Sequence, residues 1–322
     1  MGDTFVFLID QRLAGNLSHV RYRENLATYA QIGPVHCFDH VEAVSKLPSG
    51  ISKIRYGAGH LYIAFVDKGA EQTVVSFHAA VGTDGVTKPV FTGVNMLDQL
   101  DVNGIFVSDP ILDFGLNLGW FAGDLNRSLQ IDLTALLERH FAHRDGEIAK
   151  LFFGASGGGF AALFFGAQFP SSLVMCVNPQ TNINRYWPPA VESYRDAAWN
   201  GKPLESMPVE FDLTKTYSKE IDTTVLYLQN LGDTSHVKHH LVPFLNEAAL
   251  PNRQFGLVLG EWGAGHRAPS RAILDHFLSG AVGSKGEWIN LTFSREVENG
   301  VAASEVLRRS TAYSSVLSST DN

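Results

Sequence analysis

A short apolar run leads directly into a glycine-rich turn at Leu151-Phe152-Phe153-Gly154-Ala155-Ser156-Gly157-Gly158-Gly159. The run predicts a buried strand, and residues 159–168 predict a helix that ends before Pro170. Ser156 therefore lies on a strand-to-helix turn that matches the pattern G-x-S-x-G. Glycine is common in this chain, with 30 in 322 residues, so the flanking strand and helix carry more weight than the pattern itself.

The glycines around Ser156 have a physical reason. A serine on so sharp a turn has a strained backbone, and glycine two residues before and after removes the Cβ atoms that would clash as strand and helix approach. The hydroxyl is then presented beside the free N–H groups of a helix N-terminus, which favour developing negative charge. We interpret Ser156 as a nucleophile. The alternatives are a turn used only for close packing or a phosphate-binding loop, although neither G-x-x-x-x-G-K-[ST] nor G-x-G-x-x-G is present.

A serine nucleophile needs a base and an acid that orients the base, and for this kind of turn they follow in the order Ser, Asp or Glu, His. Asp233 comes after a predicted strand at 223–228, and His266 comes after a predicted strand at 255–259. Each precedes a predicted helix, as expected for catalytic groups on loops. Asp233 also fits a plain helix N-cap. We predict a catalytic triad of Ser156, His266 and Asp233, with no metal ion.

An oxyanion hole needs two N–H donors. One is expected from the backbone of Gly157, which follows the nucleophile, and the other from the end of an earlier strand. Ser76-Phe77-His78-Ala79-Ala80 occurs at such a place, so the backbone of Ala79 or Ala80 is the expected second donor. His78 is expected to orient this loop rather than to transfer a proton.

Together these elements resemble the α/β-hydrolase superfamily, over about residues 60–280. The resemblance rests on an antiparallel hairpin predicted at 61–66 and 73–77, on Phe77-His78-Ala79-Ala80 and Gly154-Ala155-Ser156-Gly157-Gly158, and on Asp233 and His266. It implies an eight-stranded, mostly parallel sheet, serine acyl transfer and no cofactor. The alanines depart from the glycines of the usual oxyanion loop. Val177-Asn178-Pro179-Gln180-Thr181 and Gly119-Trp120-Phe121-Ala122-Gly123-Asp124 are also similar to members associated with bacterial surface-glycan O-acetyl esters.

The rest of the chain predicts an α/β fold, with a mostly parallel central sheet and helices on both faces. Residues 61–66 and 73–77 predict an antiparallel hairpin. We expect an accessory N-terminal segment at 1–59, with a strand at 5–9 and a helix at 25–32, then a catalytic domain at 60–283. A polar C-terminal tail at 284–322 is expected to pack only weakly. Residues 178–220 predict an irregular insert after the sixth strand, which is a candidate cap over the site.

The composition is that of a globular protein, with 45% hydrophobic and 18% charged residues. The net charge is −8, and no basic run occurs, which argues against nucleic-acid binding. Two cysteines exclude a disulfide framework, and the N-terminus lacks a signal-peptide pattern, so we expect a cytoplasmic protein. Residues 151–169 carry no charge and approach the length of a membrane span, but a buried strand and central helix account for them without membrane insertion.

Two further groups of side chains stand out. His236, His239 and His240 lie close together, and His236 and His240 have a metal-ligand spacing of one helical turn, but a solvated helix face is the favoured interpretation. The second group contains the candidate substrate contacts, which are His78, Trp120, Gln180, Tyr186 and Trp187. The aromatic side chains of this group could instead pack in the core.

The sequence as a whole predicts a serine hydrolase that acts on a small-molecule or glycan ester through an acyl-enzyme. An O-acyltransferase that passes the acyl group to a carbohydrate hydroxyl fits the same residues, because water exclusion and acceptor binding decide between the two. A non-catalytic binding or scaffold protein, with residues 178–220 as its contact surface, is the alternative from another class. The oligomeric state is left open.

Overall fold

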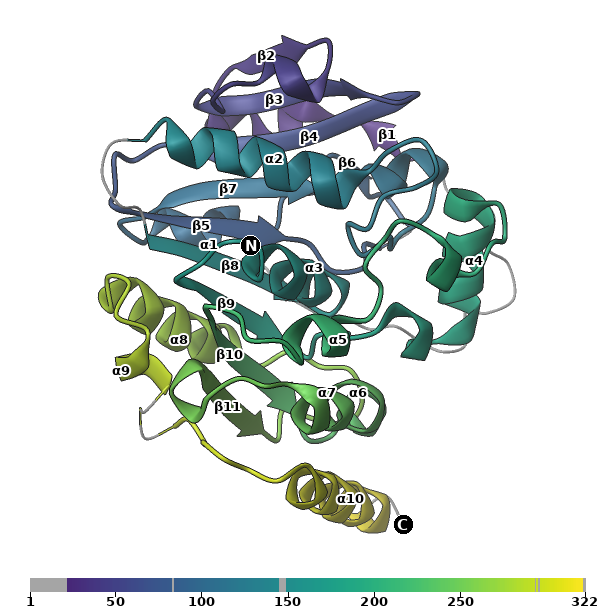
Figure 1. Cartoon of the computed structure of the whole chain (residues 1–322), viewed down its shortest axis with the longest axis vertical. Helices are drawn as coiled ribbons and strands as arrows, with labels where there is room; N and C mark the ends of the chain where they lie inside the picture. The colour runs from purple at the N-terminus through teal and green to yellow at the C-terminus, as the bar shows by residue number, and fades with distance from the viewer. Residues whose placement is uncertain (1–21, 83, 145–148, 293, 295, 321–322) are drawn as a thin grey trace.

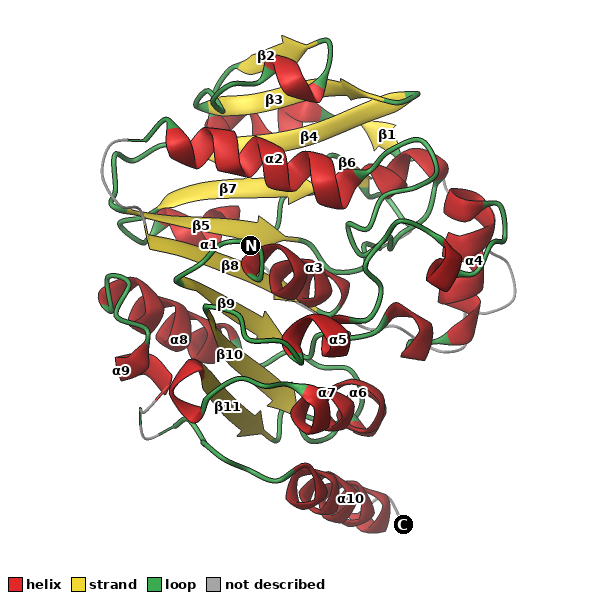
Figure 2. Cartoon of the chain, in the orientation of Figure 1, coloured by secondary structure: helices red, strands yellow, loops and turns green. Residues whose placement is uncertain are grey.

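The computed structural model of the protein describes residues 22–82, 84–144, 149–292, 294 and 296–320. In these residues a nine-stranded sheet runs through the molecule, with helices packed against it (Figures 1 and 2). Its strands are β2 (Val35–Phe38), β3 (Gly50–Tyr56), β4 (Gly59–Val66), β5 (Gln72–Phe77), β7 (Asn103–Ser108), β8 (Ala149–Ala155), β9 (Ser172–Val177), β10 (Thr223–Asn230) and β11 (Phe255–Gly260). A separate two-stranded sheet joins β1 (Arg23–Glu24) to β6 (Thr87–Lys88).

The sheet is mostly parallel, which confirms the predicted fold class. Its strand order is β11-β10-β9-β8-β5-β7-β4-β3-β2, and the run from β11 to β7 is parallel throughout. β4 is antiparallel to both of its neighbours, and β2 is parallel to β3. The carboxyl ends of the parallel strands therefore meet at one edge, which is where α/β proteins bind their ligands.

The helices are mostly short. They are α1 (Val94–Asp98), α2 (Leu129–Ala142), α3 (Gly157–Gly166), α4 (Pro188–Trp199), α5 (Leu213–Tyr217), α6 (Thr234–His236), α7 (Val242–Glu247), α8 (Arg271–Gly283), α9 (Ile289–Thr292) and α10 (Ala303–Thr320). A π-helical turn, η7 (Val237–Leu241), connects α6 to α7, and 3₁₀ turns include η2 (Leu26–Ile32) and η5 (Ile183–Arg185).

The central strands are buried on both faces. In β8, Phe152 packs in the cluster that contains Phe160 of α3, whereas Leu151 and Phe153 pack in the cluster that contains Phe277 of α8. Strands covered on both faces read as continuous apolar runs. This packing explains the uncharged residues 151–169, and none of the described helices is long and apolar enough to cross a membrane.

The predicted hairpin between residues 61–66 and 73–77 is wrong. β4 and β5 do run in opposite directions, but β7 lies between them in the sheet. All six residues of β5 are buried, so no polar–apolar alternation in the sequence identifies its neighbours. After β5 the chain passes through β6 and α1, and then forms β7, which lies between β5 and β4 in the sheet.

The N-terminal segment contributes to the sheet, since β2 and β3 pair within it. They raise the count of strands to nine, against the eight that the resemblance implies. Residues 178–220 follow β9 as expected, but β9 is the seventh described strand of this sheet along the chain, because β2 and β3 were not predicted and the count of six included the strand at 5–9. The predicted helix at 25–32 is present as η2, and the predicted strand at 5–9 lies outside the described residues.

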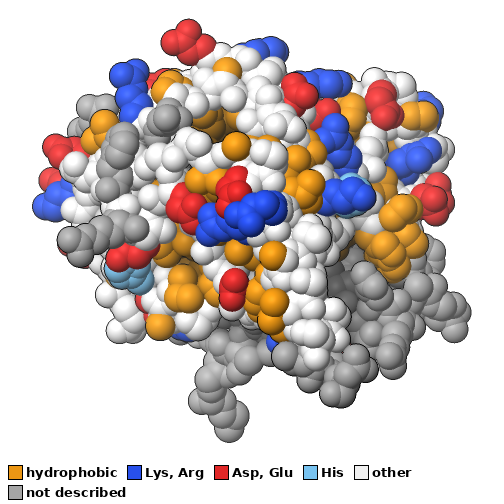
Figure 3. Space-filling view, turned by 90° about the horizontal axis from the view of Figure 1, so that it is seen from below, with side chains coloured by type: hydrophobic (Ala, Val, Ile, Leu, Met, Phe, Trp, Pro, Cys, Tyr) orange, Lys and Arg blue, Asp and Glu red, His pale blue; other side chains and the backbone are white. Residues whose placement is uncertain are grey.

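The C-terminal tail packs more firmly than predicted. Val306 of α10 is 0% exposed, and the Ser310 hydroxyl donates to the carbonyl of Leu231 over 2.9 Å. α10 lies against α7, beyond the β11 end of the sheet (Figure 1). Acidic and basic side chains are interspersed on the face seen from this end (Figure 3). The serine-rich sequence of this helix does not show that positions such as Val306 and Ser310 are buried against the rest of the protein.

Candidate active site

Ser156 sits on the turn between β8 and α3 and is the N-cap of α3. Its backbone has φ 55° and ψ −120°, a conformation that costs a residue with a Cβ on the order of 1–3 kcal/mol. A Cβ on Gly154 would lie 2.1 Å from the carbonyl oxygen of Gly158, so strand and helix can approach this closely only with glycine there. The strained turn expected from the sequence is thus present, and Ser156 is 2% exposed.

Asp233 and His266 meet at the same edge of the sheet. Asp233 follows β10 and caps α6, where its Oδ1 accepts from the backbone N–H of His236 (3.1 Å). Its Oδ2 accepts from Nδ1 of His266 over 2.5 Å. Asp233 therefore both caps a helix and holds an imidazole, two roles that the sequence had offered as alternatives. With the hydrogen on Nδ1, the Nε2 atom of His266 keeps its lone pair.

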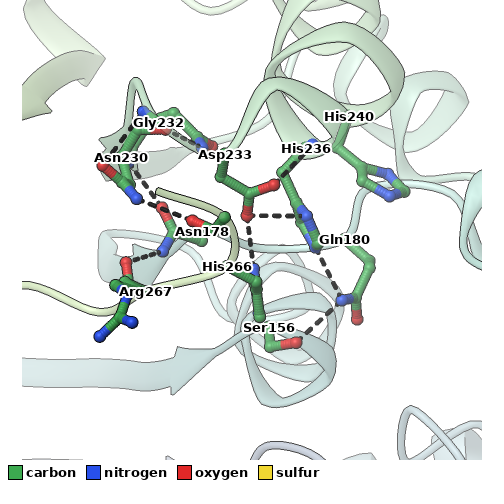
Figure 4. Close-up of polar contacts among 12 residues, drawn as sticks. Ser156, Asn178, Gln180, Asn230, Gly232, Asp233, His236, His240, His266 and Arg267 are labelled. Carbon is green, nitrogen blue, oxygen red and sulfur yellow. Dashed lines mark hydrogen bonds and ion pairs between the residues drawn. The ribbon is translucent and has the colours of Figure 1, made fainter. Parts of the chain in front are cut away.

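Figure 4 shows His266 between Asp233 and Ser156. Among the described residues, no hydrogen bond joins Ser156 to His266, and the Ser156 hydroxyl oxygen instead accepts from Nε2 of Gln180 over 2.8 Å. The structure thus brings all three predicted catalytic residues to one place and completes the contact between Asp233 and His266.

Gln180, predicted as a substrate contact, is hydrogen-bonded to the Ser156 hydroxyl. It is 0% exposed, in the loop that follows β9. Its Oε1 accepts from Nε1 of Trp120 (3.1 Å), and its Nε2 contacts both the Ser156 hydroxyl and Nε2 of His236 (3.0 Å). Trp120 and Phe121 both have φ 54°, so this loop is strained too, and the backbone N–H of Phe121 is held by Asp109 (2.9 Å).

His236 is a functional candidate that the sequence analysis missed. It is 4% exposed, its ring stacks on His266 at 4.1 Å between centroids, and its Nδ1 lies 2.9 Å from Oδ2 of Asp233. Burial lowers the pKa of His236 to about 4, against an ordinary 6.5. Burial raises the pKa of Asp233, but the two histidines beside it outweigh this and hold it well below its usual range.

The expectation of a solvated histidine face is wrong for His236 and His240, which are buried, and right for His239, which is exposed. Tyr186, from the insert after β9, packs its ring against both buried imidazoles. Because this cover comes from a distant segment, the local sequence does not reveal it. The one indication in the sequence that His236 and His240 share a face of the helix was their spacing by one helical turn.

Asp233, His236 and His266 also place three ligand-type atoms within 4.8 Å of one another. The Nδ1 atoms of His236 and His266 both contact one oxygen, Oδ2 of Asp233, at 2.9 and 2.5 Å. Ligand atoms about 2.1 Å from a tetrahedral metal ion lie about 3.4 Å apart, so this oxygen is closer to both nitrogens than the ligands of one ion are to each other. This geometry suits hydrogen bonding to a shared carboxylate.

The loop after β5 packs against the start of α3. A Cβ on Gly158 would lie 2.5 Å from the carbonyl oxygen of Phe77, which brings the following residues, Ala79 and Ala80, close to the N-terminus of α3 where Gly157 lies. His78 donates from Nδ1 to the Ala79 carbonyl (2.7 Å) and accepts at Nε2 from the backbone N–H of Asp109 (2.9 Å). Both ring nitrogens are thus used inside the protein, and burial lowers the pKa of His78 to about 4.

The remaining candidate substrate contacts divide by exposure. Trp120 is buried, with its indole N–H committed to Gln180. Tyr186 and Trp187 are half-buried, and Trp187 is the N-cap of α4 in the insert. Tyr186 packs edge-on against Trp120. The half-buried pair therefore remains available to a ligand, whereas Trp120 supports the site from behind.

Two neighbouring cavities are lined in part by residues of α1 and α8. A small apolar one of about 20 Å³ is lined by Ala79, Ala155 and Ala268, among others. A larger one of about 400 Å³ is lined by residues that include Tyr29 and Arg271. Both are lined by Thr92 and Met96, so these two side chains separate the cavities.

No protein-family model matches the sequence, and no curated protein matches it either. Solved structures do match. The capsule O-acetyltransferase of Neisseria meningitidis serogroup A superposes with a TM-score of 0.54 at 13% identity, over 69% of this chain and 91% of that chain. MPT51 (FbpC1) of Mycobacterium tuberculosis gives a TM-score of 0.52 at 14% identity, over 75% of this chain and 100% of that chain.

The chain has the α/β-hydrolase fold. The resemblance stated from the sequence is thereby confirmed at the level of fold. In the α/β-hydrolase fold the strained serine turn follows a central strand, which matches Ser156 after β8. At identities this low the likeness concerns architecture, so the chemistry has to be argued from the residues themselves.

Proposed function

We propose that the protein is a serine-dependent esterase in which Ser156 attacks an ester carbonyl, His266 accepts its proton and Asp233 orients His266. The observation that carries the proposal is the 2.5 Å hydrogen bond between His266 and Asp233, at the sheet edge where the strained turn presents Ser156. A carboxylate on Nδ1 fixes the tautomer and stabilises the imidazolium that forms during attack.

In the proposed reaction a bond forms between the Ser156 oxygen and the carbonyl carbon while the hydroxyl proton passes to Nε2 of His266. The negative oxygen of the tetrahedral intermediate is bound by the N–H groups of Gly157 and of Ala79 or Ala80. His266 then gives its proton to the departing alcohol, which leaves an acyl-enzyme. Water, activated by His266, hydrolyses the acyl-enzyme and restores Ser156.

A second candidate is an O-acyltransferase, in which a carbohydrate hydroxyl takes the place of water in the last step. The structural similarity to a capsule O-acetyltransferase favours it, together with the half-buried aromatic side chains of Tyr186 and Trp187, which suit stacking against a sugar ring. Product analysis with and without glycan acceptors separates the two candidates, because only a transferase forms an acylated glycan. The cytoplasmic location expected from the sequence remains part of the proposal.

Labelling with a fluorophosphonate probe tests the nucleophile. We expect the folded protein to be labelled at Ser156 and to hydrolyse p-nitrophenyl acetate, and Ser156→Ala to lower kcat by roughly 10⁶-fold. Ser218→Ala, which changes an exposed serine after α5, is the matched control and should behave as wild type. Absence of labelling in folded protein would favour a non-catalytic binding protein with residues 178–220 as its contact surface.

We propose that the acyl chain enters the small cavity lined by Ala79 and by Ala155, the residue before Ser156, so that its volume sets the length of the chain. Its volume of about 20 Å³ has room for a group the size of a methyl, so acetyl esters should be turned over faster than butyryl or octanoyl esters. Met96→Ala should join the two cavities and shift this preference toward longer chains. The measurement is kcat/KM across a p-nitrophenyl ester series, with Leu274→Ala, which enlarges only the small cavity, for comparison.

A further inference from the structure

One set of buried polar contacts has no role in the reaction as described. It runs from Asp233 to His236, from His236 to Gln180 and from Gln180 to Ser156, with distances of 2.9, 3.0 and 2.8 Å (Figure 4). Every member of this chain is buried. A second imidazole therefore shares the Asp233 carboxylate with His266 and is connected to the oxygen of Ser156.

The direction of the hydrogen bonds that Gln180 makes follows from Trp120. An indole nitrogen only donates, so the Gln180 atom that it contacts must be the carbonyl oxygen. The other end of the amide is then NH₂, whose two hydrogens point to the Ser156 oxygen and to Nε2 of His236. An Nε2 that accepts must leave the ring hydrogen on Nδ1, which lies 2.9 Å from Oδ2 of Asp233 in a charge contact that is not an aligned hydrogen bond.

This arrangement orients the Ser156 hydroxyl. A hydroxyl has one hydrogen and two acceptor lone pairs. Because one lone pair is occupied by the amide of Gln180, which can only donate at this end, the hydroxyl hydrogen has to be donated to another group. In the proposed reaction that group is His266, which Figure 4 shows on the same side of Ser156 as Asp233.

His236 differs from His266 in what its second nitrogen faces. Nε2 of His236 is occupied by the amide hydrogen of Gln180, and burial keeps the pKa of this ring near 4, so His236 is uncharged at neutral pH. Its partner His266 has its Nε2 unoccupied by any described hydrogen bond. In the proposed reaction His266 therefore transfers protons, whereas His236 holds Gln180 in place.

We propose that His236 and Gln180 are positioning residues of the active site, which together hold the Ser156 oxygen so that its hydrogen is directed toward His266. This inference rests on the proposed function. It gives His236 a role as a neutral ring fixed between Asp233 and Gln180, and Gln180 a role as the link between that ring and the nucleophile.

The tautomer of His236 tests the arrangement in the wild-type protein. With ¹⁵N-labelled histidine, NMR at pH 7 should show His236 neutral with its hydrogen on Nδ1. The signal is assigned by its loss in His236→Phe, or from contacts with the Tyr186 ring if that variant does not fold. A charged His236, or one with its hydrogen on Nε2, overturns the proposal.

Kinetics test the role. His236→Phe keeps a ring to stack on His266, and Gln180→Met keeps the length of the side chain, but neither variant can make the hydrogen bond between His236 and Gln180. Each should lower kcat on p-nitrophenyl acetate by about 10- to 100-fold while KM changes little, since the substrate is not contacted. His239→Phe, an exposed position on the same turn, should match wild type.

The double variant, His236→Phe with Gln180→Met, shows whether the two residues act through one another or independently on kcat. If His236 acts through Gln180, the combined variant should lose no more than the stronger single variant. Losses that multiply, or a His236→Phe enzyme with full kcat, overturn the proposal while leaving the esterase proposal intact. Failure of Ser156 to react with the fluorophosphonate in wild type instead removes the proposed function, and the positioning role with it, whatever the tautomer.

Discussion

His236 and His140 are both buried imidazoles, but the molecule uses them differently. His140, in α2, accepts at Nδ1 from the backbone N–H of Leu47 (3.2 Å), packs edge-on against Phe65 and leaves its buried Nε2 without a partner among the described residues. His236 has Asp233 on one side and Gln180 on the other. Burial lowers the pKa of each to about 4. Burial alone therefore does not make a histidine functional, and the carboxylate beside it is what distinguishes the site.

The largest expected effect removes that carboxylate. Asp233→Asn should lower kcat on p-nitrophenyl acetate by about 10⁴-fold, because a neutral amide neither fixes the tautomer of His266 nor stabilises its charged form. The matched variant His140→Gln, which keeps an acceptor for Leu47, should leave kcat unchanged. Equal losses in the two variants, measured on protein with wild-type circular dichroism, would show that the two histidine sites do not differ in the way described.

The second prediction concerns stability against pH. Because His78, His140 and His236 have folded pKa values near 4, below the 6.5 of an unfolded chain, the unfolded state binds more protons between these values. Their contribution to stability is therefore complete above about pH 6.5 and is lost progressively as the pH falls toward 4. Each ring accounts for roughly 2–3 kcal/mol of this loss.

Urea denaturation at pH 7 and pH 4.5 measures this loss. His140→Gln should be less sensitive to pH than wild type, because glutamine does not titrate. An unchanged pH dependence in this variant would mean that His140 binds its proton in the folded protein as easily as in the unfolded one.

The smallest effect concerns the support of Gln180. Trp120→Phe removes the indole N–H that fixes the orientation of the amide but keeps an aromatic ring in the strained loop. Loss of one neutral hydrogen bond, worth about 1 kcal/mol, predicts a decrease in kcat of about 5-fold. A loss as large as that of Gln180→Met would show that the indole does more than orient the amide.

The chain order of Ser156, Asp233 and His266 was predictable because each follows an apolar strand and precedes a helix, and parallel strands deliver such loops to one edge. The pairing of β4 with β7 was not predictable, because β5 is buried along its whole length and has no alternation of polar and apolar residues that would indicate its neighbours. Local sequence identifies strands of this kind but leaves their order to tertiary packing.

The surroundings of the site were less accessible to prediction than its three central residues. Gln180 was singled out, but its contact with Ser156 depends on an indole sixty positions earlier in the chain. The burial of His236 depends on Tyr186 in the insert. Such contacts join segments that no sequence window contains, and short polar side chains in loops carry no periodicity to mark them.

The last helix has a consequence for anyone who handles the protein. Ser310 of α10 is bonded to the carbonyl of Leu231, and a Cβ on Gly232 would lie 2.8 Å from the ring of Tyr313, so α10 presses on the two residues that precede Asp233. Trimming the serine-rich end as dispensable would uncover the loop that carries the carboxylate. Purification handles are therefore better fused at the other end of the polypeptide.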